Sequence, residues 1–326
     1  MRVAVLRGGR SSEHDVSLSS GASVAAGLAE AGHEVVDVVV GRDGRWICEG
    51  SEVVLHPAGG LLDCDVAFPV MHGPYGEDGT IQGVLEALAI PYAGPGVLAA
   101  ATTIDKLTCK RLLARRGIAQ VAFTQAAIPG EAEAAWKARV AELGLPVWVK
   151  PSRLGSSVGI VKVEREADLG EAVAEALRYD PRVIVEAHAP GREVECSVLG
   201  NDEAIASPPG ELDVHADWYD YAAKYEAGGM DLTVPAPIGD ELVARVQELA
   251  LEVFHLCDCS GLARCDFFVT DEDEVLVNEI NTIPGFTATS VYSRLFEAGG
   301  IPYPELCDRL VKLGIERFES QRKFEF

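Results

Sequence analysis

The chain has 326 residues, 48% of them hydrophobic and 24% charged, which is typical of soluble globular proteins. This length predicts two or three domains, with ligands bound in the clefts between them. The 28 Lys and Arg residues against 51 Asp and Glu residues give a net charge of −23. A field of this sign repels phosphate backbones and anionic lipids, so we expect neither nucleic acid nor membrane as a partner. Only eight lysines occur, so an anionic substrate must be bound by few cationic side chains.

The N-terminus shows neither the apolar run of a signal peptide nor a transit-peptide composition, and no run reaches the length of a membrane span. We therefore expect a cytoplasmic protein. The eight cysteines are scattered and contain no CxxC pair, which agrees with a reducing compartment. Cys257-Asp-Cys259 comes closest to a metal motif, but we expect these two cysteines to be small buried hydrophobic residues.

The first part of the chain has the pattern of a βαβ unit with a parallel sheet. The predicted elements are strands at 2–6, 34–40 and 65–70, a turn at 8–12, and helices at 19–31 and 79–88. Ligands of such sheets bind beyond the carboxyl ends of the strands. The loops after Leu6 and Val70 are therefore candidate sites, and they contain Glu13, His14 and His72. A single histidine is more often a hydrogen-bonded core residue than a functional group.

Turn-forming residues place domain boundaries near 94 and near 189–191. The middle segment predicts a compact α+β unit, with helices at 105–116, 131–143 and 166–179 and strands at 147–150, 159–163 and 183–186. The last segment predicts strands at 193–199, 262–269 and 275–280 and helices at 239–256 and 303–318. We therefore expect an N-terminal domain at 1–94, a central domain at 95–189 and a C-terminal domain at 190–326.

A Gly-Ser loop at 150–159, Lys-Pro-Ser-Arg-Leu-Gly-Ser-Ser-Val-Gly, lies between two predicted strands. Small residues let backbone N–H groups surround an anion, and Lys150 adds a charge. A plain hairpin turn explains this loop about equally well. The chain has no GxxxxGK[ST] motif, which excludes a P-loop NTPase. Pro95 within Gly94-Pro-Gly96 disfavours a Rossmann dinucleotide site and with it an oxidoreductase.

Two neighbouring predicted strands carry Arg264 with Asp266 and Glu279 with Asn281. Residues i and i+2 of a strand share a face, so these polar groups can converge. Oxygen ligands without Cys or His suit Mg²⁺. The alternative is a cross-strand ion pair between Arg264 and a carboxylate that only stabilises the sheet. The phosphate-type loop favours the metal, because a buried acidic cluster without a cation is unfavourable.

The segment 281–290, Asn-Thr-Ile-Pro-Gly-Phe-Thr-Ala-Thr-Ser, is rich in backbone and hydroxyl donors. Such donors suit a carboxylate or a developing oxyanion. Glu13 is a candidate acceptor for a substrate ammonium, and its alternative is a helix N-cap or surface carboxylate.

Nine segments in this order resemble the successive motifs of D-alanine:D-alanine ligases, a family of the ATP-grasp superfamily. They are GGRSSEHDVSLSSG, HGPYGEDGTIQG, IPYAGPG, DKLTCK, VKPSRLGSSVGI, GREVECSVLG, WYDYAAKY, ARCDFF and NEINTIPGFTATS. The resemblance implies an α/β fold of three domains, with ATP held between the central and C-terminal α+β domains and a substrate-binding parallel-sheet domain at the N-terminus.

The resemblance also implies ATP-dependent ligation of two D-alanines through a D-alanyl phosphate, a step of peptidoglycan precursor synthesis. It implies two Mg²⁺ or Mn²⁺ ions. Family members are generally dimers, and some are activated by K⁺.

Site residues follow from the matching positions. The resemblance assigns ATP binding to Lys106, Lys150, Ser156, Ser157, Glu186, Ala187, Ala189, Glu193, Asn278 and Glu279. It assigns the metal ions to Asp266, Glu279 and Asn281. It assigns substrate binding and catalysis to Glu13, His72, Ser156, Lys224, Tyr225, Arg264, Gly285 and Ser290. Within that set Arg264 and Gly285 form the oxyanion hole, and Lys224 and Ser290 hold the second carboxylate.

Three alternatives remain at this stage: a related ligase that uses D-serine or D-lactate as second substrate, a catalytically inactive nucleotide-binding protein of the same fold, and a Rossmann oxidoreductase. Tyr225 favours D-alanine as the acceptor, and the complete set Asp266, Glu279 and Asn281 favours an active enzyme.

Overall fold

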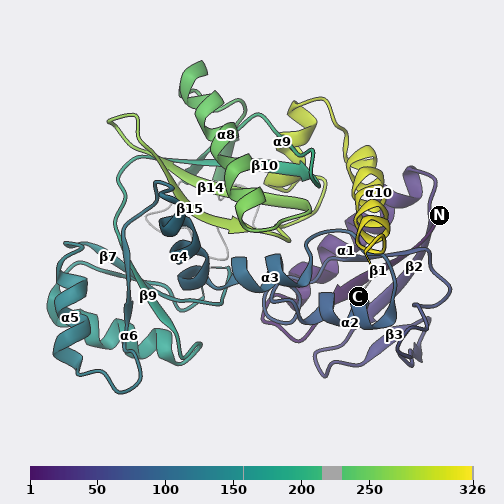
Figure 1. Ribbon diagram of the computed structural model, residues 1–326, viewed down its shortest axis with the longest axis horizontal. Coiled ribbons are helices and arrows are strands. Elements are labelled where there is room, and N and C mark those ends of the chain that lie inside the picture. Colours follow the sequence, from purple (N-terminus) through teal and green to yellow (C-terminus); the bar gives the residue numbers. More distant parts are fainter. Residues whose placement is uncertain (157, 215–229, 325–326) are drawn as a thin grey trace.

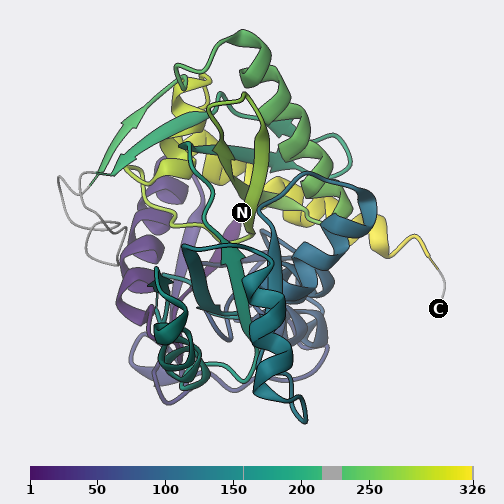
Figure 2. The same cartoon turned by 90° about the vertical axis from the view of Figure 1, so that its left-hand side faces the viewer.

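Three separate sheets organise the chain in the computed structural model, which describes residues 1–156, 158–214 and 230–324 (Figure 1). The N-terminal sheet lies on one side, the central sheet on the other, and the C-terminal sheet spans the region above both. Figure 2 shows the same arrangement from the side, with the green C-terminal sheet above the teal central one.

The N-terminal sheet has the predicted parallel core. Its order is β4-β3-β2-β1-β5, with β1 parallel to both β2 and β5. The strands are β1 (Arg2–Gly8), β2 (Glu34–Val40), β3 (Trp46–Cys48), β4 (Ser51–Glu52) and β5 (Val66–Pro69). One face packs against α1 (His14–Glu30) and α10 (Tyr303–Gln321), and the other packs against α2 (Thr80–Leu88).

The first helix begins at His14 rather than at the predicted residue 19. The sequence His-Asp-Val-Ser is polar and carries no strong helix signal, but Ser17 and Ser20 are buried against the sheet and fix this first turn. Ser17 hydrogen-bonds the N–H of Gly8 and the carbonyl of Val70. The extra turn brings Glu13 to the end of the helix, next to the ends of β1 and β5.

The central sheet is antiparallel and has the order β6-β9-β7-β8. Its strands are β6 (Phe123–Ala126), β7 (Val147–Pro151), β8 (Val161–Val163) and β9 (Val183–Ala187). Helices α5 (Glu133–Ala141) and α6 (Leu169–Leu177), the latter preceded by the short turn η1 (Glu166–Asp168), pack on one face through Val147, Val149 and Val185. Because side chains alternate along a strand, Lys150 and Glu186 lie on the opposite face.

The C-terminal sheet also has one apolar and one polar face. Its order is β13-β12-β10-β14-β15, with β11 paired to β10. The strands are β10 (Arg192–Gly200), β11 (Ile205–Ala206), β12 (Gly210–Val214), β13 (Met230–Thr233), β14 (Gly261–Val269) and β15 (Val275–Asn281). Helix α8 (Asp240–Leu256) covers the apolar face, where Cys196 and Cys265 are fully buried. Cys257 and Cys259 are buried in the same cluster, as expected.

Several elements were not predicted. Helix α3 (Val97–Ile104) precedes α4 (Lys106–Arg116), α9 (Val291–Ala298) follows the 281–290 loop, and β3, β4, β6, β11, β12 and β13 are short strands. Short strands depend on pairing with a neighbour more than on their own pattern. Helix α3 follows Pro95 and Gly96, which indicated only a turn.

The last helix returns to the first sheet. Leu306 and Leu310 of α10 pack in the same core cluster as Val3 and Val5 of β1. Buried Arg317 donates hydrogen bonds to the carbonyls of Gly94 and Tyr92 and stacks on the Tyr92 ring, 4.2 Å from its centroid. The C-terminal end of the chain therefore stabilises the segment that leads out of the N-terminal sheet.

Candidate active site

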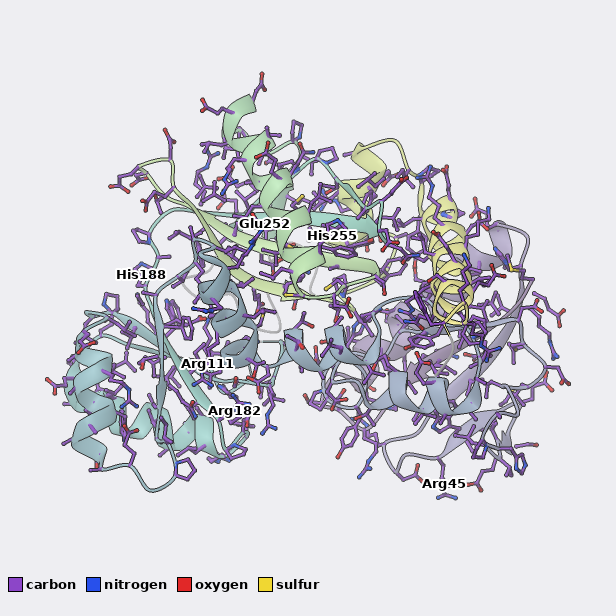
Figure 3. The ribbon with its side chains drawn as sticks, viewed as in Figure 1. Arg45, Arg111, Arg182, His188, Glu252 and His255 are labelled. Atoms are coloured by element: carbon purple, nitrogen blue, oxygen red, sulfur yellow. The ribbon has the colours of Figure 1, made fainter. Side chains whose placement is uncertain are left out.

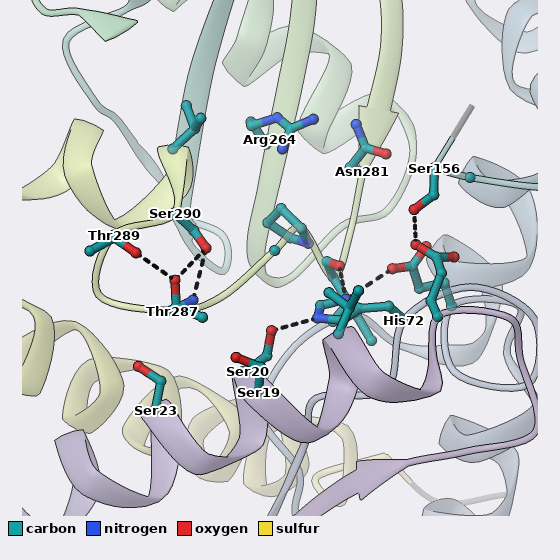
Figure 4. A pocket seen from close by; sticks show the side chains of 18 of the residues that line it. Ser19, Ser20, Ser23, His72, Ser156, Arg264, Asn281, Thr287, Thr289 and Ser290 are labelled. Atoms are coloured by element: carbon teal, nitrogen blue, oxygen red, sulfur yellow. Dashed lines mark hydrogen bonds and ion pairs between the residues drawn. The ribbon is translucent and has the colours of Figure 1, made fainter. Parts of the chain in front are cut away.

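A cleft of about 750 Å³ opens where the three sheets meet (Figure 4). It is lined by α1, the loop after β5, the Gly-Ser loop, β14, β15 and the 281–290 loop. Predicted site residues on its wall are Glu13, His72, Ser156, Arg264, Glu279, Asn281, Gly285 and Ser290. The loops after β1 and β5, the Gly-Ser loop and the 281–290 segment, all singled out from the sequence, therefore line one cavity.

Glu13 links the N-terminal domain to the Gly-Ser loop. The hydroxyl of Ser156 donates a hydrogen bond to its carboxylate, across 143 positions of the chain. Glu13 occupies the N-cap position of α1 but makes no side-chain capping bond, and it is only 6% exposed. Glu13 is therefore the N-cap residue by position, as the alternative had it, but its carboxylate neither caps the helix nor lies at the surface. The loop does connect a hairpin, since β7 and β8 pair antiparallel, and it also reaches the cleft.

His72 is buried, and its ring contacts Ile283, Ser20 and Glu77. Its Nδ1 donates to the carbonyl oxygen of Ile283 at 3.0 Å, and its Nε2 lies 2.9 Å from Ser20 Oγ. The carboxylate of Glu77 lies 3.5 Å from Nδ1. Burial opposes protonation of His72, but Glu77 outweighs it, so the pKa of the ring is raised. Burial and the charge of Glu13 raise the pKa of Glu77, against the effect of His72.

Lys106, at the start of α4, joins the Gly-Ser loop to the C-terminal sheet. Its ammonium lies 3.2 Å from Glu279 and donates to the carbonyl oxygen of Leu154 at 2.9 Å. Burial works against the charge of Lys106, yet the neighbouring Glu279 raises its pKa overall. The lysine is therefore charged, and it lines a smaller pocket that shares Glu279 and Asn281 with the cleft.

The N-terminus of α4 is anchored by Asp105. Its carboxylate accepts hydrogen bonds from the N–H of Thr108 (3.1 Å) and the hydroxyl of Ser152 (2.8 Å). Arg182, labelled in Figure 3, donates to the same carboxylate at 2.5 Å. Asp105 thus fixes the helix that carries Lys106 to the base of the Gly-Ser loop.

Lys150 forms an ion pair on the face of the central sheet opposite α5 and α6. Its ammonium lies 2.6 Å from one carboxylate oxygen of Glu186, and the ammonium of Lys110 lies 3.1 Å from the other. Burial would raise the pKa of Glu186, but the two ammonium groups outweigh it and hold the pKa at about 2. Glu186 is therefore ionised at neutral pH.

The polar face of the C-terminal sheet carries Arg264 and the predicted metal ligands. Arg264 forms a bidentate pair with Asp266, at 2.7 and 2.8 Å, and lies 2.9 Å from Glu195. The amide of Asn281 donates to Asp266 at 2.9 Å. Asp266 lies opposite Glu279 in the register of β14 and β15, and the register shifts directly after this pair. The cross-strand pair expected as the alternative is therefore present between Arg264 and Glu195 of β10, and the pair with Asp266 lies along β14 itself.

The donor set fits a hard divalent cation. Glu279 and Asn281 line the cleft, and Asp266 is buried next to them, where it accepts a hydrogen bond from Asn281. Mg²⁺ usually completes such a set of two carboxylates and an amide with waters and phosphate oxygens. In the described part of the chain, no three His, Cys, Asp or Glu side chains are grouped as metal ligands. The carboxylates are neutralised by Arg264 and Lys106 instead.

The 281–290 loop borders the cleft on the other side. Ser290 occupies the N-cap position of α9 without a side-chain capping bond, and its hydroxyl accepts from the N–H of Thr287 at 3.0 Å. Figure 4 shows these residues facing Ser19, Ser20 and Ser23 of α1. Gly285 lies in the same wall, so a backbone N–H and several hydroxyls are grouped there.

The remaining predicted nucleotide residues lie along the central and C-terminal sheets. Ala187 and Ala189 follow Glu186 and are half-buried, and Glu193 lies on β10 opposite Phe268. Asn278 is the residue left unpaired where the β14–β15 register shifts. Ser157, Lys224 and Tyr225 lie outside the described residues.

Glu77, Lys110 and Glu195 were not assigned from the sequence. Glu77 belongs to the loop after Val70 that was singled out, and Lys110 follows Lys106 by one helical turn. Glu195 follows Glu193 by two positions on β10, so it shares the polar face. Their partners come from distant segments, so spacing alone does not identify their roles.

Comparison with known proteins agrees with this geometry. Two family models match, described as "D-ala D-ala ligase N-terminus" over residues 2–59 and 55–95 and "D-ala D-ala ligase C-terminus" over residues 112–312. The D-alanine--D-alanine ligase of Deinococcus radiodurans is 46% identical, covering 97% of this chain and 98% of its own. That of Geobacillus kaustophilus is 39% identical, covering 100% and 97%.

Solved structures agree as well. The D-alanine-D-alanine ligase from Coxiella burnetii superimposes with a TM-score of 0.88 at 35% identity, covering 99% of this chain and 96% of its own. The VanG D-Ala:D-Ser ligase from Enterococcus faecalis gives 0.87 at 33% identity, covering 96% and 99%. With both family halves matched and relatives similar over nearly their whole length, the chain belongs to the D-alanine–D-alanine ligase family and has its three-domain ATP-grasp fold.

Proposed function

We propose that the chain is an ATP-dependent ligase that joins two D-alanines into D-alanyl-D-alanine for peptidoglycan synthesis. The observation that carries the proposal is the Glu13–Ser156 hydrogen bond in a cleft that Arg264 also lines, with Lys106 in the smaller pocket beside it. In this proposal the ammonium acceptor and the oxyanion donor share the cleft, and a phosphate-binding lysine lies next to it. The related ligases named above support the same activity.

The first chemical step activates a carboxylate. An oxygen of the first D-alanine attacks the γ-phosphorus of ATP, the bond to the β-phosphate oxygen breaks, and ADP leaves. Glu13 binds the ammonium of this D-alanine and orients it, with Ser156 closing over it. Lys106 and Lys150 neutralise charge on the transferred group.

The second step forms the peptide bond. The amine of the second D-alanine attacks the acyl carbon and phosphate leaves after the amine has lost a proton. Arg264 and the N–H of Gly285 stabilise the tetrahedral oxyanion, and removal of one such donor typically lowers the rate by about 10²- to 10³-fold. Arg264 is preoriented by Asp266 and Glu195. Ser290 and Lys224 hold the carboxylate of the acceptor, and Tyr225 acts with Ser156.

A divalent cation, Mg²⁺ or Mn²⁺, would be held by Asp266, Glu279 and Asn281, and when bound it supplies further positive charge to the phosphates. We propose two such ions, and activation by K⁺ as in some family members. The adenine and ribose would be bound by Glu186, Ala187, Ala189, Glu193 and Asn278, with Ser157 on the phosphate side.

Release of phosphate from ATP tests the proposal. Purified protein with ATP and MgCl₂ should release phosphate when D-alanine is added and should yield the dipeptide. L-Alanine should give no release. D-Serine and D-lactate, each added with D-alanine, test the acceptor, and a mixed product in excess over D-alanyl-D-alanine would contradict the assignment of D-alanine. Absence of phosphate release with every substrate would contradict the proposal as a whole.

We also propose three domains at 1–94, 95–189 and 190–326, a homodimeric state and a cytoplasmic location. The three sheets support the division, although α10 of the last segment packs on the first sheet. No helix within the described ranges has the length and apolarity needed to span a bilayer. Sedimentation velocity measures the oligomeric state directly.

A further inference from the structure

Helix α4 presents two lysines to two different sheets. Lys106 and Lys110 lie one turn apart on one face of the helix. Lys106 pairs with Glu279 of β15, whereas Lys110 pairs with Glu186 of β9. Lys106 borders the cleft, but Lys110 is only 2% exposed. The proposed mechanism gives Lys110 no contact with the nucleotide.

Glu186 has two cationic partners that differ in position. The side chains of Lys110 and Glu186 are each 3% exposed, and that of Lys150 is 15% exposed. The inner ammonium is thus Lys110 and the outer one is Lys150. The three groups together carry a charge of +1, and without Lys110 they would carry none.

This arrangement matters when a phosphate attracts Lys150. Moving Lys150 from Glu186 to a phosphate would leave a buried carboxylate without a cation, which is strongly unfavourable. With Lys110 in place, the carboxylate keeps one ion pair while Lys150 moves. Burial opposes ionisation of Glu186, yet its two lysines keep the pKa low, so the carboxylate is ionised before Lys150 moves.

We propose that Lys110 is a positioning residue that acts through Glu186 to make the charge of Lys150 available to the phosphates of ATP. The inference rests on the proposed function, because it takes ATP as the ligand. It assigns a role to a buried side chain that makes no contact with substrate.

Binding of ATP and of adenosine by calorimetry in MgCl₂ tests the inference. Lys110→Met should raise the Kd for ATP by about tenfold or more, because about 1.4 kcal/mol corresponds to a factor of ten. The Kd for adenosine, which carries no phosphate, should stay within about twofold of wild type, because Lys150 then remains paired with Glu186 and the carboxylate keeps a cation. A merely structural role of Lys110 would weaken both ligands alike, and that result would overturn the inference.

A double-mutant cycle isolates the route through Glu186. In a Glu186→Gln background no buried carboxylate needs a cation, so Lys110→Met should then change the Kd for ATP by less than about twofold. An equal effect in both backgrounds would overturn the inference. Lys110→Gln, measured in the same way, replaces Lys110→Met if thermal melting shows that the methionine variant does not fold.

Lys312→Met is the matched control. Lys312 is an exposed lysine of α10 paired with Asp308, and its loss changes the net charge equally without approaching the cleft. Its affinity for ATP should equal that of wild type. If wild-type protein binds no ATP, the proposed function fails; if wild type binds ATP and Lys110→Met binds it equally well, only the inference fails.

Discussion

The variant Gly73→Ala tests the position of the Glu13 carboxylate. Gly73 has a φ of +72°, and a Cβ there would lie 3.3 Å from the carboxylate carbon of Glu13 and closer still to its Oε2. Ordinary contact begins at 3.4 Å, and Oε2 would lie about 1 Å inside that limit. The carboxylate therefore has to move by on the order of 1 Å. A displacement of that size lowers kcat/KM by about 100-fold. The left-handed backbone lowers the stability by a further 1–2 kcal/mol or so.

Phosphate release at saturating ATP and varied D-alanine measures this loss, and calorimetry should show an unchanged Kd for ATP. Gly83→Ala is the matched control, because Gly83 lies within α2, has no atom within 4 Å of a Cβ and should keep full activity. Gly73→Ala with a wild-type kcat/KM for D-alanine would refute the role of Glu13. An equal loss of ATP affinity would show that the damage is not confined to the amino acid site.

Three further predictions concern stability. Gly314→Ala should lower the free energy of unfolding, measured by urea denaturation, by about 2–3 kcal/mol. Its Cβ would lie 2.6 Å from the carbonyl carbon of Tyr92 and 2.9 Å from the N of Ala93. Gly170→Ala on α6, where a Cβ meets open space, should leave the free energy of unfolding unchanged. Asp105→Ala should lose about 2–4 kcal/mol through its cap and the Arg182 pair, and Asp105→Asn less, since an amide oxygen can still accept. Glu186 has a folded pKa of about 2 against an ordinary value of 4.5. Its ionised form therefore contributes up to about 3 kcal/mol to the free energy of unfolding above pH 4.5, and this contribution is lost as the pH falls towards 2. The free energy of unfolding of Glu186→Gln, measured in urea, should fall less steeply over that pH range.

Local patterns predicted the parts of the site that depend on strand geometry. The ends of β1 and β5 are adjacent in a parallel sheet, so the loops that follow them had to bring Glu13 and His72 together. Alternation along β14 placed Arg264 and Asp266 on one face, and the structure adds that they pair with each other. These features follow from a period and a chain order, both of which are visible in the sequence.

Other parts depend on contacts that no period encodes. The partner of Lys110 lies on β9, and the pairing becomes visible only when α4 packs against the central sheet. The return of α10 to the N-terminal sheet fills a core that the first segment cannot close alone. The helix pattern of α10 predicts its existence but not its neighbour, because an amphipathic helix fits any apolar surface of suitable shape.

The cations around the cleft are already paired within the protein. Lys106 contacts Glu279, Lys150 contacts Glu186, and Arg264 contacts Asp266. The free-energy cost of removing these cations from water is therefore incurred on folding. A phosphate that binds them would only replace a carboxylate as their ionic partner. In the proposed function each exchange would leave a carboxylate that needs a cation. A divalent ion would serve Glu279 and Asp266, and Lys110 would serve the more deeply buried Glu186. Under these two proposals, a chain of net charge −23 with eight lysines would bind a triphosphate without leaving a buried carboxylate unpaired.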